Sequence, residues 1–192
     1  MSRIAPLFAS WLLLVACGGH SASDPPSKTD AGVTAVTGSI GGVTFPAAAY
    51  AIAVPDNSNV MTSDPYNEYA KLALAIAGKP LGCTTPSLPD SEIIGITLIA
   101  VGPVPIGPGT YEIDADPQSS SNNNADLVTT DATCTQAAPA NCIGGSVTIT
   151  SATSTTIAGS FTLAFDSGEA MTGTFNAGVC DAIPAAISGN PC

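Results

Sequence analysis

Apolar and polar residues alternate with a period of two along much of this chain. In "KLALAIAG", residues 71–78, Leu72, Leu74 and Ile76 fall on one face with alanines between them. In "EIIGITLIAVG", residues 92–102, apolar side chains occupy both faces. The first pattern predicts a half-buried strand, and the second predicts a central strand that is covered on both sides.

Three runs near the carboxyl end predict a meander of antiparallel strands. They are "GSVTIT", "IAGSFTLAF" and "AMTGTF", at residues 145–150, 157–165 and 170–175. Between the last two, "DSGE" at residues 166–169 is a short glycine-containing link that suits a hairpin. Further strands are expected at residues 35–45, 47–54, 109–113 and 125–131, with the glycines at 41 and 42 bending or turning the chain.

These patterns together predict the fold class. About eight to ten short strands are expected, with turn residues between them. The sixteen prolines of the chain separate strands and would break helices. We therefore expect an all-β protein, an antiparallel β-sandwich or barrel that carries disulfides, as a single domain over residues 34–192.

The amino-terminal segment has the layout of a signal peptide. One positive charge at Arg3 is followed by an apolar run from Leu7 to Ala16, which is too short to span a bilayer before the glycines at 18 and 19. Residues 14–17, "LVAC", resemble the lipobox of bacterial lipoproteins. The alternative is an ordinary secretory signal whose cysteine falls at the junction.

The lipobox resemblance implies a lipid anchor at Cys17. In that family the cysteine thiol is acylated, for example with palmitate, the preceding peptide is removed, and the new amino terminus is acylated too. Two or more acyl chains give stable membrane attachment. Residues 1–16 would then be the signal peptide and residues 17–33 a lipidated flexible tether, and Gly18 in place of aspartate favours the outer membrane.

Net charge limits the class of partner. The formal charge is −11, and loss of Arg3 with the signal peptide leaves three lysines against fifteen acidic residues. Such a surface repels phosphate backbones, so we expect no nucleic-acid binding. The expected partners are the membrane, through the lipid, and an envelope protein or glycan.

The cysteine count predicts disulfides. Once Cys17 is assigned to the lipid, an odd number of cysteines remains in a chain that is exported to an oxidising compartment. We expect two disulfides and one thiol that is free or paired elsewhere, and the sequence leaves the pairing open. No CxxC spacing or histidine partner indicates a metal site. The disulfide candidates are Cys83, Cys134, Cys142, Cys180 and Cys192.

Little in the chain indicates catalysis, and we predict neither an enzyme nor a cofactor. The one histidine, His20, lies in the tether, where no scaffold can align it with a nucleophile. One alternative is a hydrolase that uses paired carboxylates, drawn from Glu92, Glu112, Asp114, Asp166 and Glu169. A second is a calcium-dependent adhesion domain with Asp114, Asp116, Asn124 and Asp126 as ligands.

A looser resemblance covers residues 107–180. The run "PGTYEI", then a cysteine, then "GGSVTITSATSTTIAGSFTLAFDSGEAMTGTFNAGVC" is similar to the carboxyl-terminal half of uncharacterised β-rich lipoproteins of myxobacteria-like bacteria. The resemblance implies an exported β domain and no known activity. The sequence therefore predicts a lipid-anchored cell-envelope lipoprotein that acts as a binding or structural module.

Overall fold

The computed structural model describes residues 32–46, 49–56, 69–102, 104–114, 123–137, 140–182 and 184. These ranges contain β-strands and no helix, so no helix among them could cross a membrane. The strands are β1 (Gly32–Thr37), β2 (Ser39–Ile40), β3 (Val43–Thr44), β4 (Ala49–Asp56), β5 (Tyr69–Ala77), β6 (Glu92–Val101), β7 (Gly109–Glu112), β8 (Asn124–Thr129), β9 (Ala140–Ala152), β10 (Thr156–Phe165) and β11 (Ala170–Val179).

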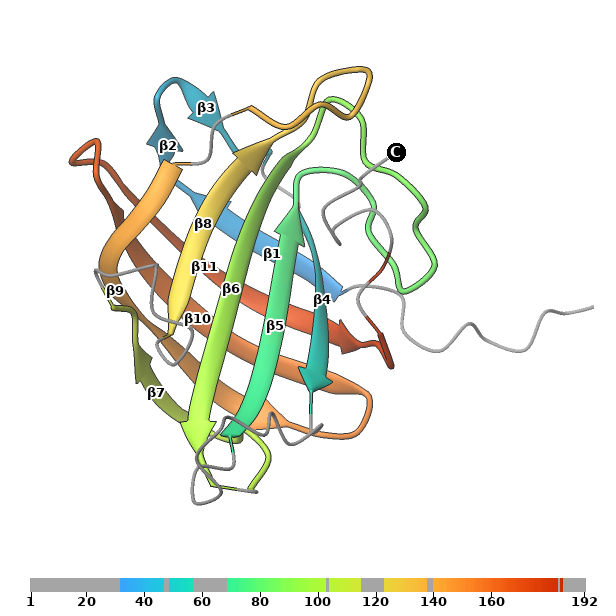
Figure 1. Cartoon of the computed structure of the whole chain (residues 1–192), viewed down its shortest axis with the longest axis vertical. Helices are drawn as coiled ribbons and strands as arrows, with labels where there is room; N and C mark the ends of the chain where they lie inside the picture. Colours follow the sequence, from blue (N-terminus) through green and yellow to red (C-terminus); the bar gives the residue numbers. More distant parts are fainter. Residues whose placement is uncertain are drawn as a thin grey trace, which may run out of the picture.

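Eight of the strands form a closed antiparallel barrel (Figure 1). The order around it is β10-β11-β1-β4-β5-β6-β8-β9, and β9 pairs again with β10 to complete the ring. A short parallel contact joins the end of β11 to β4, where Gly178 lies beside Ile52. β8 pairs with the first residues of β9, and β7 pairs with a later part of the same strand. β2 and β3 form a separate small hairpin.

Side chains fill the inside of the barrel. A barrel of about eight strands is just wide enough for side chains to occupy its interior. Alternate residues of each long strand point inward, which is why the period of two was so regular along the sequence. The largest of these fully buried side chains include Leu72, Leu74, Ile76, Ile94, Ile96, Leu98, Leu163, Phe165 and Met171.

A second, smaller core lies on the outer face of β4, β5 and β6. Residues 78–91, which connect β5 to β6, place Leu81 and Leu88 against outward side chains such as Ile52 and Ile93. The hydroxyl of Thr130 donates a hydrogen bond to the carbonyl of Leu88 and accepts one from the amide of Ser91 at 3.1 Å. This cover explains why Ile93, an outward residue at the start of β6, is apolar and buried.

The predicted fold class is confirmed, and the barrel is the form that it takes. The predicted meander is β9, β10 and β11, and the "DSGE" link is the turn between the last two, where Gly168 has a φ of 83°. The glycines at 41 and 42 form the turn between β2 and β3 with φ values of 56° and 83°. The proposed signal peptide and most of the tether lie outside the described residues, whereas residues 32–33 belong to β1.

Candidate functional site

Small residues form a depression on the outer face of the sheet. The pairing register places Ala75 of β5 beside Ile52 of β4 and beside Gly95 of β6. On its other side, Gly95 lies beside Asp126 of β8. Because alanine and glycine stand between larger residues in this row, the surface is hollowed there.

We call this depression the outer trough, and its volume is about 340 Å³. One neighbouring row contributes Ala73 and Thr97 and the other contributes Ile93 and Val128. The lining is mostly apolar, with Asp126 and Gln136 as its long polar side chains. The outer trough is lined by Ile52, Val54, Ala73, Leu74, Ala75, Ile93, Gly95, Ile96, Thr97, Asp126, Val128 and Gln136.

The carboxylate of Asp126 lies over the backbone of Gly95. A Cβ at position 95 would come within 2.5 Å of the Asp126 Oδ1 atom, so the missing side chain makes room for the carboxylate. Burial raises the pKa of Asp126, and a hydrogen bond from its own backbone amide opposes the rise. No cationic side chain among the described residues contributes to this pKa, so the carboxylate is partly desolvated without a charged partner.

Gln136 reaches the outer trough from the connection between β8 and β9. That connection turns back along β8, where Gln136 forms an isolated bridge with Thr130 and the amide of Ala137 donates to the carbonyl of Thr129 at 2.9 Å. The site therefore offers an apolar floor, one half-buried carboxylate and one amide. Such a set can hold an apolar group that ends in a cation or a hydrogen-bond donor.

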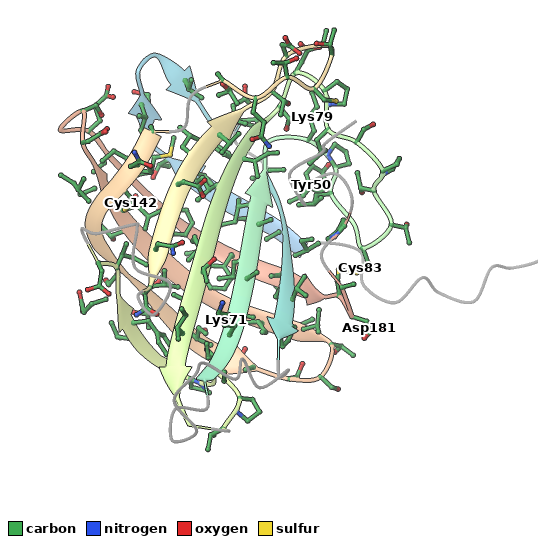
Figure 2. All side chains as sticks on the ribbon, viewed as in Figure 1. Tyr50, Lys71, Lys79, Cys83, Cys142 and Asp181 are labelled. Carbon is green, nitrogen blue, oxygen red and sulfur yellow. A yellow bond between two sulfur atoms is a disulfide. The ribbon has the colours of Figure 1, made fainter. Side chains whose placement is uncertain are left out.

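A further hollow continues the outer trough toward the end of β4. It shares Val54, Ala73 and Thr97 with the trough and adds Lys71 and Asp181. Figure 2 shows Lys71 on the outer face of β5 and Asp181 beyond the end of β11. The region after β11 therefore borders the same face of the barrel as the trough.

The cysteines fall into different environments. Cys83 and Cys180 form a disulfide with a Cα–Cα distance of 5.3 Å, which fastens the β5–β6 connection to the residue that follows β11. Cys134 is also disulfide-bonded, to a partner outside the described residues. Cys142 is a free thiol buried in the barrel, where burial raises its pKa. Cys17 and Cys192 lie outside the described ranges.

The acids named for a hydrolase occupy three separate places. Glu92 begins β6, Glu112 ends β7 with Asp114 two residues later, and Asp166 and Glu169 lie in the β10–β11 turn. The Glu169 carboxylate accepts hydrogen bonds from the amide of Gly41 at 2.7 Å and the hydroxyl of Ser167 at 3.1 Å. The acid that lines the outer trough is a different one, Asp126.

The proposed calcium ligands are only partly described. Asp116 lies outside the described residues, Asp114 is exposed, and Asn124 and Asp126 point outward from β8. Within the described ranges, no group of three or more histidine, cysteine or acidic residues could hold a metal ion.

Comparison with protein-family models, curated proteins and solved structures gave no match. The site is therefore interpreted from its own chemistry. Sequence reasoning named Asp126 only as a calcium ligand and did not identify the outer trough. The available signal was the run of small outward residues at positions 73, 75 and 95 between larger inward ones.

Proposed function

We propose that this protein is a lipid-anchored module of the cell envelope that binds a partner through the outer trough. The group bound there has an apolar stem and a cationic head, as an alkylammonium or a lysine side chain has. One observation carries the proposal: a half-buried carboxylate without a charged partner among the described residues, beside an apolar depression. A cation at Asp126 would compensate the desolvation of its charge.

Because side chains fill the barrel, we place the proposed binding site on its outer face. Buried side chains from all eight barrel strands occupy the interior, and they include phenylalanines at positions 161, 165 and 175. The outer trough, by contrast, opens on the surface between β4 and β8. The acids named for a hydrolase do not line it, so they lend no support to catalysis at this site.

The proposed anchor rests on the lipobox resemblance of residues 14–17. The polar, proline-bearing residues that follow suit a tether. About fifteen such residues reach on the order of 20 Å from the membrane. The barrel would then be held near the membrane surface, at the outer membrane, with its outer trough available to neighbouring envelope molecules.

Binding is tested by nuclear magnetic resonance titration with hexylammonium, with 1-hexanol as the neutral ligand of the same stem. Hexylammonium is expected to shift the signals of Thr97 and Val128 and to bind more tightly than the alcohol. Asp126→Asn is expected to weaken hexylammonium binding about tenfold to a hundredfold, since a hydrogen bond to a charged group contributes about 1.5–3 kcal/mol. Asp166→Asn, at an exposed turn, is the matched control. The proposal would be contradicted if hexylammonium and 1-hexanol bound with equal affinity. It would also be contradicted if Asp126→Asn and Asp166→Asn bound hexylammonium equally well.

The anchor is tested by metabolic labelling of the producing cells with a fatty-acid analogue. The wild-type protein is expected to carry the label and to partition into detergent, whereas Cys17→Ser is expected to lose both properties. Equal labelling of the two proteins would remove the anchor from the proposal and leave the binding experiment unaffected.

A further inference from the structure

Lys71 lies on the same outer face as the outer trough, and small residues separate the two. On β5 the outward positions run from Lys71 through Ala73 to Ala75, which lines the trough (Figure 2). Ala75 lies beside Gly95, which the Asp126 carboxylate covers. A step of four residues along a strand spans about 13 Å. The face therefore carries a cation at one end and a carboxylate at the other.

Lys71 carries an ammonium that the fold does not use. Among the residues that the structure describes, its side chain forms no hydrogen bond and no ion pair, although Asp181 borders the same hollow. Lys79 differs, because its ammonium donates a hydrogen bond to the carbonyl of Pro89 at 2.5 Å. Lys71 therefore presents the kind of group that the outer trough is proposed to bind, a four-carbon apolar stem that ends in a cation.

We propose that two copies of this chain associate through this face, with Lys71 of each copy inserted into the outer trough of the other. In this dimer, which rests on the proposed function, the lysine bound in the trough belongs to a second copy. Ala73 and Thr97 lie side by side, midway between the row of Lys71 and the row of Asp126. A two-fold axis that runs through this pair, across the strands, exchanges the two rows. Each dimer then contains the contact between Lys71 and Asp126 twice, as a two-fold interface requires.

The middle row allows two such faces to approach each other. Ala73 and Thr97 meet their own counterparts at the axis, and neither side chain is long. Sheets that pack face to face lie about 10 Å apart, with their strands nearly aligned. At that separation the stem of Lys71 can extend into the trough of the facing copy. Its ammonium then compensates the desolvated carboxylate of Asp126.

The size and charge of the face make the dimer weak. From β4 to β8 the face is three interstrand spacings wide, about 14 Å, and it is about 13 Å long between its charged ends. A stable complex buries considerably more, about 800 Å² on each partner. The formal charge of −11 on each copy also opposes association. The dimer is therefore expected at high concentration, such as the proposed lipid anchors would produce on a membrane.

Sedimentation equilibrium of the full chain tests the dimer, in a density-matched detergent so that an acyl chain causes no association. From about 10 µM to about 1 mM protein, in about 0.15 M salt, the wild-type protein is expected to pass from monomer toward dimer. Asp126→Asn is expected to weaken dimerisation at least about a hundredfold, because each dimer loses both charge pairs. A wild-type protein that stays monomeric over this range, or that forms larger oligomers, would overturn the inference.

Exchange of the two charges distinguishes this contact from any other. Asp126→Lys and Lys71→Asp are each expected to be monomeric, because like charges then face each other twice. An equimolar mixture of the two variants is expected to dimerise, because a lysine then faces an aspartate at both contacts. Asp166→Lys, with the same change of charge at an exposed turn, is the matched control and should dimerise like the wild type. If both variants are folded and their mixture stays monomeric, the inference is wrong.

Competition with a small ligand tests the same contact without a substitution. Hexylammonium is expected to dissociate the wild-type dimer, whereas 1-hexanol, which has no charge, should leave most of it intact. A monomeric protein that binds hexylammonium in the outer trough would overturn the dimer and leave the proposed function in place. A protein that neither dimerises nor binds hexylammonium would overturn both. A dimer that persists when hexylammonium fills the trough would show that the copies associate through another surface.

Discussion

Asp126 and Asp131 lie close together in the sequence, yet their environments shift their pKa values in opposite directions. Burial in the outer trough raises the pKa of Asp126. The hydroxyl of Thr133 and the amides of Thr135 and Thr133 donate hydrogen bonds to Asp131 and lower its pKa. Ionisation of the first residue therefore opposes folding, and ionisation of the second supports it.

We expect Asp126→Asn to stabilise the protein at neutral pH. The folded-state pKa of Asp126 lies above its unfolded value, so the cost of its charge is present at pH 7 and is relieved as pH falls through the folded pKa. The variant should gain about 0.5–1 kcal/mol in free energy of unfolding at pH 7. The gain should vanish below the unfolded pKa. Urea unfolding at pH 7 and under acid conditions measures this, and a gain that persists in acid would contradict the account.

We expect the opposite result for Asp131→Ala. The stability from its hydrogen bonds is present above the unfolded pKa and is lost as pH falls through the lowered folded pKa. The variant should be less stable than the wild type at neutral pH and equally stable in strong acid. The same urea experiment applies, with Asp166→Ala as the control at another exposed turn. A deficit that stays constant with pH would show that the hydrogen bonds of Asp131 are not its cause.

The sequence alone predicted the roles and environments of individual residues only in part. Asp126 was recognised as a possible ligand because of its chemistry and its neighbours in the sequence. Its position over Gly95 depends on the register between β6 and β8, which are separated along the chain by β7. A residue whose environment is set by such a pairing cannot be assigned from local sequence.

At the scale of elements, the strands were predictable because burial imposes a strict alternation. β5, β6, β9, β10 and β11 each place one set of alternate residues in the core, and this pattern stands out in the sequence. The choice between sandwich and barrel was not predictable, because both folds require the same alternation. That choice depends on the pairing of β11 with β1, which joins opposite ends of the chain.

The outer trough also arises between elements. β5 contributes Ala73 and Ala75, β6 contributes Gly95, and each strand alone shows only a small residue at an outward position. The sequence also did not predict that residues 78–91 cover the neighbouring outer face. No pattern in the sequence around Leu81 and Leu88 indicates that they fold back onto the sheet.

At the scale of the whole molecule, the Cys83–Cys180 disulfide closes a loop with a sequence separation of 97 residues. Removal of a native disulfide of a small exported domain costs about 2–5 kcal/mol, through the freedom regained by the unfolded chain. The double variant Cys83→Ala, Cys180→Ala is therefore expected to lose about 2–5 kcal/mol in free energy of unfolding. Cys142→Ala, which breaks no disulfide, is the control.

Urea unfolding measures this loss. Unchanged stability of the double variant would mean that the packing of residues 78–91 holds that side of the barrel without the bond. If removal of the disulfide destabilised only the β5–β6 connection, that connection would be cleaved faster by a protease. The midpoint of global unfolding in urea would then stay unchanged.

Closure of the sheet also affects how copies behave when they are crowded. In the part of the chain that the structure describes, β7 is the one strand at a free end of the large sheet. It is four residues long and follows the prolines at 105 and 108. A short, proline-flanked edge is a poor template for strands of another molecule. If the proposed lipid anchor concentrates copies of this chain on one membrane surface, the copies would therefore resist strand-to-strand aggregation at densities where an open sheet would not.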